Sequence, residues 1–300
     1  MNTYPASQRI VVGVDGSRGA ARAADWAAAL AAHRGTGLHL VHALNLSGAA
    51  TLLSRLPFEE YRQNRTKQAE ELLDRLRSEL LEKFPGLWIS TEICADEPAE
   101  ALVAASGQAA LTVVGTRGHG GFPGLRLGSV GLRLAAHSHG PMVLVPAEEE
   151  PAAEHRAGHG IVLGVAAREP AEVIDFGFLL AEELGEPLRA VHAWQPVPPY
   201  NGYYYIEPSV LATAADELLK ALLKPALRAH DMVPAQADAV CAVPAAALVD
   251  AARDARLLVL GAHRHRTALS IGVGSVLHAL LTHAPCPVAI VPITPHGAQN

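Results

Sequence analysis

Apolar and polar positions follow two alternating patterns along this chain. Short, nearly continuous apolar runs suit strands that are covered on both faces. The longer segments between them place apolar residues three and four positions apart, which is typical of helices with one buried side. In the first half, the predicted strands are residues 10–14, 38–43, 88–94, 111–115 and 142–145, and the predicted helices are 18–34, 58–84, 98–108 and 130–138.

This alternation of strand and helix predicts a mostly parallel sheet with helices on both faces. In sheets of this kind, a ligand binds beyond the carboxyl ends of the strands, where the winding direction reverses. The segments that directly follow strands are therefore the first places to look for function.

The second half repeats the first half in the same order. Ile161 follows Ile10 by 151 residues and Val288 follows Met142 by 146, so the spacing changes little. The matched blocks are 9–14 with 160–165, 41–43 with 191–193, 111–115 with 257–261, 128–130 with 274–276 and 141–146 with 287–292. Such a repeat indicates a duplicated domain. We expect a first domain at 1–147, a charged linker at 148–158 and a second domain at 159–300.

Composition narrows the classes of partner. The chain has 30 acidic and 24 basic residues and a formal charge of -6. Without a basic stripe, this argues against nucleic acid and anionic membranes as partners. Its three cysteines form no CxxC pair, which favours a reducing compartment. The first residues lack the apolar segment of a signal peptide, and no run reaches the roughly 20 apolar residues of a membrane helix. We expect a cytoplasmic protein that binds small molecules or proteins.

Two segments after strands are candidates for a site. Asp15, Gly16 and Ser17 follow the first predicted strand, and taken alone they fit an ordinary turn with Ser17 as the N-cap of the next helix. Residues 115–128 follow the fourth predicted strand and contain six glycines, whose uncovered N–H groups suit a polyphosphate. Gly128 and Ser129 open the next helix, where unpaired N–H groups and the helix dipole favour a phosphate.

The glycine-rich segment has an alternative interpretation as a flexible surface loop capped by Ser129. Connections in such sheets are usually shorter, however, and longer ones are more often functional. The segment lacks the lysine of a Walker loop, and no G-x-G-x-x-G follows the first strand. We therefore expect backbone groups to hold the phosphates.

The spacing Gly115-x2-Gly118-x9-Gly128-Ser129 resembles the G-2x-G-9x-G(S/T) ATP-binding signature of the universal stress protein family. The resemblance extends over nearly the whole chain as two tandem units. It implies two Rossmann-like domains of the adenine nucleotide α-hydrolase-like type, each an α/β fold with a five-stranded parallel sheet of order 3-2-1-4-5. Asp15 and Gly115 would then lie side by side.

By this resemblance the first domain binds ATP, with or without Mg²⁺. Asp15 is expected to contact the adenine or ribose, and Val41 to flank the base. Arg117 and His119 are either phosphate contacts or solvated loop residues. The implied cofactor-binding residues of the first domain are Gly13, Asp15, Val41, Gly115, Thr116, Arg117, Gly118, His119, Gly128, Ser129 and Val130.

The second domain departs from the signature. Ala166 stands where the first domain has Asp15, and Arg264 stands where it has Gly118. Losing the carboxylate removes a polar contact, and a side chain at the second glycine blocks close approach of the backbone. We expect weaker or absent ATP binding here, although Arg264 offers a charged donor in place of bare amides. The signature residues that the second domain keeps are Gly261, Gly274 and Ser275.

The leading functional hypothesis is a nucleotide-dependent regulator or sensor in the stress response, with little or no catalysis. The alternatives are a slow ATPase or adenylate-forming enzyme, and a scaffold that binds no nucleotide. No paired carboxylates or lysine converge on the glycine-rich segment to activate water. The His-x-His pairs at 137–139 and 263–265 lack a further ligand at metal spacing, so no metal site is expected.

Self-association is also expected. The final apolar strand of each half would lie at a sheet edge, which must be paired or shielded. In the family that the chain resembles, this strand makes the dimer contact. The resemblance therefore implies an intrachain pseudo-dimer of the two domains and a homodimer of two chains.

Overall fold

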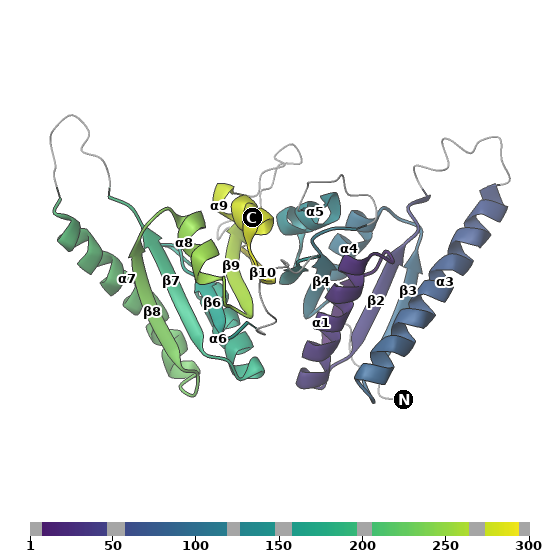
Figure 1. Cartoon of the computed structure of the whole chain (residues 1–300), viewed down its shortest axis with the longest axis horizontal. Helices are drawn as coiled ribbons and strands as arrows, with labels where there is room; N and C mark the ends of the chain where they lie inside the picture. The colour runs from purple at the N-terminus through teal and green to yellow at the C-terminus, as the bar shows by residue number, and fades with distance from the viewer. Residues whose placement is uncertain are drawn as a thin grey trace, which may run out of the picture. The chain divides into compact units, whose positions relative to one another are not determined.

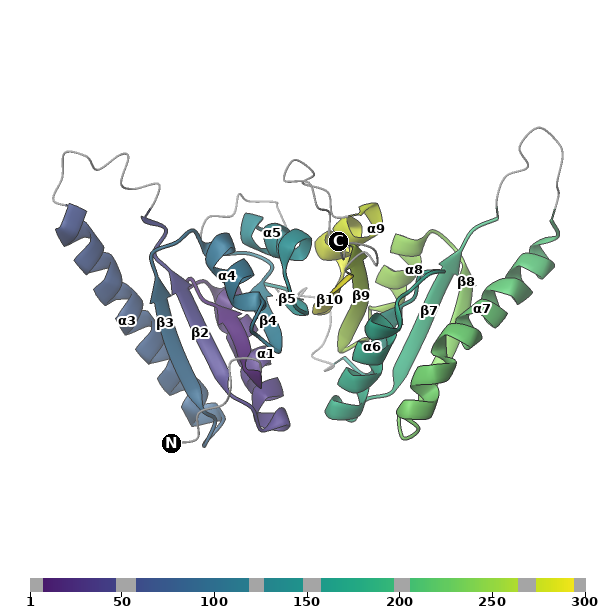
Figure 2. The ribbon, with the colours of Figure 1, turned by 180° about the vertical axis from the view of Figure 1, so that it is seen from behind.

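The computed structural model describes residues 8–46, 58–118, 127–147, 158–196, 206–263 and 274–293. The chain forms two compact units. Each unit is an α/β domain in which helices cover both faces of a parallel sheet (Figures 1 and 2). The α/β fold predicted from the sequence is confirmed, and the two units are described separately below.

The first unit has its strands in the order β3-β2-β1-β4-β5, and the pairs are parallel. The winding direction therefore reverses between β1 and β4, as the family resemblance implies. The strands are β1 (Ile10–Gly13), β2 (Leu38–Ala43), β3 (Ile89–Cys94), β4 (Leu111–Gly115) and β5 (Met142–Val145). The helices are α1 (Arg18–Arg34), α3 (Phe58–Lys83), α4 (Pro98–Ser106) and α5 (Ser129–His137).

The core of the first unit is aliphatic. Ile10, Leu38 and Leu111 start three neighbouring strands, and each is fully buried. Helix α1 packs against α3, whereas α4 packs against α5, so each face of the sheet has a pair of helices (Figure 1). Alanines on α1 allow this helix to lie close to β4, because a short side chain keeps the two backbones near each other.

The second unit repeats this arrangement with the order β10-β9-β6-β7-β8. Its strands are β6 (Ile161–Gly164), β7 (Leu188–Trp194), β8 (Ala235–Cys241), β9 (Leu257–His263) and β10 (Val288–Ile293). Its helices are α6 (Ala171–Leu184), α7 (Pro208–Ala229), α8 (Pro244–Ala251) and α9 (Ser275–His283). Because β6 corresponds to β1 and β9 to β4, the winding reverses at the same point in both units.

Two further findings bear on function. Among the helices that the structure describes, none is long and apolar enough to span a bilayer. Within the same residues, no group of three or more His, Cys, Asp or Glu side chains is placed to hold a metal ion.

Candidate functional site

The candidate site lies at the carboxyl ends of β1, β2 and β4. Gly13 at the end of β1 is in register with Val41 of β2, and Val12 is in register with Val113 of β4. The two segments predicted to form a site, which start at Asp15 and Thr116, therefore leave the sheet from adjacent strands. Their proximity depends on the strand order, since about 100 residues separate them along the chain.

The turn after β1 is held by its own side chains. Asp15 Oδ1 accepts a hydrogen bond of 2.9 Å from the Ser17 N–H. Ser17 Oγ in turn accepts one of 3.1 Å from the Ala20 N–H and caps α1. Gly16 between them has φ of 84°, which favours glycine. The prediction that Ser17 is an N-cap is confirmed.

The two predicted segments touch at Asp15 and Gly118. A Cβ atom at Gly118 would overlap Asp15 Oδ2, so the absence of a side chain lets the carboxylate lie against the backbone of the second segment. A similar restriction applies at Gly115, where a Cβ atom would lie 2.7 Å from the carbonyl carbon of Gly19 at the start of α1. Gly115 is therefore required by the close approach of the α1 backbone, whereas Gly118 makes room for the Asp15 side chain.

The ends of the glycine-rich segment are joined by the backbone. The Gly128 N–H donates a hydrogen bond of 2.7 Å to the Thr116 carbonyl, and the Thr116 N–H donates one of 2.8 Å to the Val145 carbonyl. Thr116 Oγ1 accepts from the Ala147 N–H at 3.1 Å. The chain therefore leaves β4 and enters α5 at one place, beside Asp15. Residues 119–126, which include the predicted site residue His119, lie outside the described residues.

Helix α5 presents the N–H donors of its first turn at this place. Gly128 is its N-cap residue and supplies no side-chain cap. Because the Gly128 N–H already has a partner, the donors for an anion are the N–H groups of Ser129 and Val130. Ser129 is exposed and Val130 is half-buried, so both lie within reach of a ligand. Arg117 precedes them, and its carbonyl packs against Gly19.

A buried histidine fixes the end of β2 to the start of the site. His42 is 8% exposed, and its Nδ1 donates a hydrogen bond of 2.8 Å to the Val14 carbonyl. Burial lowers the pKa of His42 from its usual range, and the bond to Val14 offsets only part of this effect. His192 makes the same bond to the Val165 carbonyl, also at 2.8 Å. Both histidines are thus satisfied by the backbone, and each positions the residue that follows β1 or β6.

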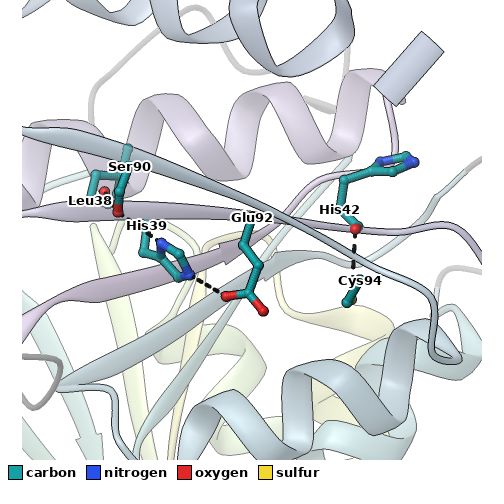
Figure 3. Close-up of polar contacts among 6 residues, drawn as sticks. All are labelled: Leu38, His39, His42, Ser90, Glu92 and Cys94. Carbon is teal, nitrogen blue, oxygen red and sulfur yellow. Dashed lines mark hydrogen bonds and ion pairs between the residues drawn. The ribbon is translucent and has the colours of Figure 1, made fainter. Parts of the chain in front are cut away.

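A second polar cluster lies on β2 and β3. Figure 3 shows the His39 ring between Ser90 Oγ, 2.8 Å from Nδ1, and Glu92 Oε2, 2.8 Å from Nε2. The Glu92 side chain is 56% exposed. The second unit has an ion pair at the same register, because Arg189 Nε contacts Asp238 Oδ2 at 2.5 Å. The duplicated position indicates cross-strand stabilisation of the outer strand rather than a nucleophilic site.

The corresponding site of the second unit has a different shape. Strand β9 continues for two residues past Gly261 and pairs with β10 as far as His263. In the first unit, strand β4 has already ended at the equivalent positions, and the glycine-rich segment has begun. Ser275 starts α9, for which Gly274 is an N-cap without a side-chain cap. The second unit therefore keeps the helix N-terminus but extends the strand that leads toward it.

A carboxyl group also occupies the second site. Glu169 Oε2 accepts a hydrogen bond of 2.8 Å from the Ala166 N–H. Among the described residues, buried Glu169 Oε1 has no hydrogen-bond partner, and it lies at the point where a Cβ atom of Gly261 would be. Burial raises the pKa of Glu169, against the effect of the bond from Ala166. No local sequence pattern singles out Glu169, because its role depends on contact with β9.

Replacing Glu169 by glutamine is expected to stabilise the second unit at pH 7 by on the order of 1 kcal/mol, because the buried charge is removed. The folded-state pKa is raised, so the wild type loses stability as pH increases through that pKa. The difference in the free energy of unfolding between variant and wild type, measured by urea unfolding, should therefore increase between pH 4.5 and pH 8. Glu172→Gln, on the exposed first turn of α6, is the control. A gap that is constant with pH would contradict this account.

Two consecutive domains of one doubly wound architecture define the class of this protein. Residues 6–146 and 159–292 match the model of the universal stress protein family. A universal stress protein of Mycobacterium bovis and one of Mycobacterium tuberculosis are each 28% identical to this chain, over 98% of this chain and 98% of theirs.

A solved structure supports the fold assignment. A crystal structure of a universal stress protein from Archaeoglobus fulgidus matches with a TM-score of 0.69 at 14% identity, over 95% of this chain and 98% of that chain. A universal stress protein solved in complex with cAMP matches with a TM-score of 0.36 at 25% identity, over 47% of this chain and 98% of that chain. The chain belongs to the universal stress protein family, with two tandem domains of that family.

Proposed function

We propose that the first unit binds an adenine nucleotide, with ATP as the ligand, and that occupancy of this site regulates the protein with little or no catalysis. The observation that carries the proposal is the contact between Asp15 and Gly118 beside the uncapped start of α5. A carboxylate, a glycine backbone and the N–H groups of a helix start without a side-chain cap then lie at one switch point. These groups suit the polar and anionic parts of a nucleotide.

Each part of the nucleotide has candidate partners. The N–H groups of Ser129 and Val130, together with the dipole of α5, suit the phosphates. The Asp15 carboxylate suits the hydroxyl or amine donors of the ribose or adenine. Val41, which is buried, and Gly13 are neighbours in register at the ends of β1 and β2, where the proposal places the base. Mg²⁺ would accompany the nucleotide as a counterion of its phosphates.

The second unit supports weaker binding in this proposal. It has Ala166 in place of Asp15, and the carboxyl group of Glu169 lies beside Gly261. One strong site per chain is the expected stoichiometry.

Nucleotide release from the purified full chain tests the proposal. Denaturing the protein should release about one adenine nucleotide per chain, held chiefly by the N–H groups of α5. Ser129→Pro removes one of these N–H groups and the hydroxyl. Proline suits the first helical position, and Gly128 before it already has φ −84° and ψ 162°. We expect this variant to fold and to release little nucleotide.

The duplication supplies the matched control. Ser275→Pro makes the same change at the start of α9, where Gly274 has φ −51° and ψ 154°. It should leave nucleotide content unchanged. If neither the wild type nor Ser275→Pro carries nucleotide, and neither binds nucleotide on titration, the scaffold alternative replaces the proposal. If ADP accumulates at a steady rate in the wild type, the slow ATPase alternative gains support.

A further inference from the structure

A surface pocket lies in the second unit at the amino-terminal end of its strands, opposite to the switch point. Its volume is about 560 Å³, within the range of about 300–1,000 Å³ that small-molecule sites occupy. It is lined by the first residues of β6, β7 and β8 and by the last turn of α8 with the residues after it. No part of it belongs to the proposed nucleotide site.

The first unit has side chains where the second unit has this pocket. Backbone hydrogen bonds establish the correspondence. The Leu38 N–H donates to the Trp88 carbonyl at 2.9 Å, and the Leu188 N–H donates to the Pro234 carbonyl at 2.8 Å. Trp88 and Pro234 therefore occupy equivalent positions directly before the outer strand of each unit.

A second pair of positions corresponds in the same way. The Arg9 carbonyl accepts from the Ala110 N–H at 3.0 Å, and the Gly160 carbonyl accepts from the Arg256 N–H at 2.9 Å. In the first unit, the Arg9 guanidinium lies over the Trp88 ring, 5.2 Å from its centroid. Where the first unit has this stacked indole and guanidinium, the second unit has proline and glycine, which line the pocket.

The charges around the pocket favour a cation. Of the charged side chains that line it, Arg189 is paired with Asp238 and His159 with Glu186. Asp250 is paired with Arg253 at 2.8 Å and is exposed. The Asp254 carboxylate makes no hydrogen bond or ion pair with the residues that the structure describes, so a positive charge brought into the pocket would be its partner.

We propose that this pocket binds a small aromatic amine. Such a ligand reproduces the groups that fill the first unit, with a flat ring against Pro234 and a protonated amine at Asp254. Burial of the ring provides most of the affinity, and the carboxylate selects for the charge. The site does not depend on nucleotide binding by the first unit.

Tryptamine is the probe, titrated by calorimetry into the full-length protein. We expect saturable binding with a Kd on the order of 0.1–1 mM, as for a ligand of this size. Pro234→Trp restores the residue type of the first unit and should abolish binding. Asp254→Asn should weaken it about tenfold. Indole-3-acetate, which has the same ring and a negative charge, should not bind.

Asp175→Asn is the control, because Asp175 is exposed on α6 and does not line the pocket. It should bind tryptamine as the wild type does. Absence of saturable binding by the wild type would overturn the proposal. Equal binding of indole-3-acetate, or unchanged affinity in Asp254→Asn, would overturn the assigned ligand class. Because Asp254 is exposed, its variant tests the proposal even if Pro234→Trp fails to fold.

Discussion

Adding one methyl group at Gly118 is expected to weaken nucleotide binding by the full chain about 10- to 100-fold. A Cβ atom at this position overlaps Asp15 Oδ2, so the carboxylate must move out of the site. The cost corresponds to losing a hydrogen bond between the nucleotide and a charged group. Gly118→Ala is the variant, and equilibrium titration with ATP is the measurement.

A double-mutant cycle tests whether the methyl group acts through Asp15. On an Asp15→Ala background there is no carboxylate to displace, so Gly118→Ala should have little further effect on affinity. Gly107→Ala is the control, because a Cβ atom there has its nearest contact at an ordinary 3.6 Å. An equal loss of affinity on both backgrounds would show that the methyl group acts independently of Asp15.

Replacing Glu186 by alanine is expected to destabilise the second unit by about 3 kcal/mol, because buried and charged partners lose their acceptor. The Glu186 side chain is 8% exposed. Its oxygens accept hydrogen bonds from the Gly160 N–H at 2.9 Å, Arg256 Nη1 at 2.9 Å and His159 Nδ1 at 2.6 Å. This carboxylate therefore joins the starts of β6, β7 and β9.

Hydrogen exchange measures this loss within one unit. Amides of β6 and β9 should exchange about 100-fold faster in Glu186→Ala, whereas those of β1 and β4 serve as the internal reference. Thr36 is the structural counterpart, since the Thr36 N–H bonds the Ala31 carbonyl as the Glu186 N–H bonds the Ala181 carbonyl. Thr36→Ala should accelerate amide hydrogen exchange far less than Glu186→Ala does. Uniformly faster exchange in both units would contradict a local role.

The contribution of Glu186 also depends on pH. Burial by itself raises the pKa of this carboxyl, but the bonds from Arg256, Gly160 and His159 outweigh burial and lower it. A lowered folded-state pKa means that the stabilisation is complete above the unfolded-state pKa and is lost as pH falls through the folded one. The difference in the free energy of unfolding between wild type and Glu186→Gln should therefore become smaller at acidic pH.

Local patterns predicted most element boundaries. Helix α1 and strands β2, β4 and β5 have the predicted bounds. The remaining differences are at element ends. The Val14 N–H still bonds the Val41 carbonyl after β1 has ended, and Gly107 and Gln108 continue α4 as a tighter turn with bonds to Ala104 and Ala105.

The sequence by itself determined the α/β class, the duplication and the two candidate segments, because apolar periodicity, repeats and glycine spacing are properties of the chain alone. That the two segments meet at the switch point was implied only by the family resemblance. The tertiary structure decided which groups in those segments are available to a ligand. It brought Asp15 against Gly118, gave the Gly128 N–H a partner, and placed Glu169 beside Gly261. It also decided that Arg9 and Trp88 stack in one unit while their counterparts line a pocket in the other. These contacts join residues that are distant in the chain, so no local pattern encodes them.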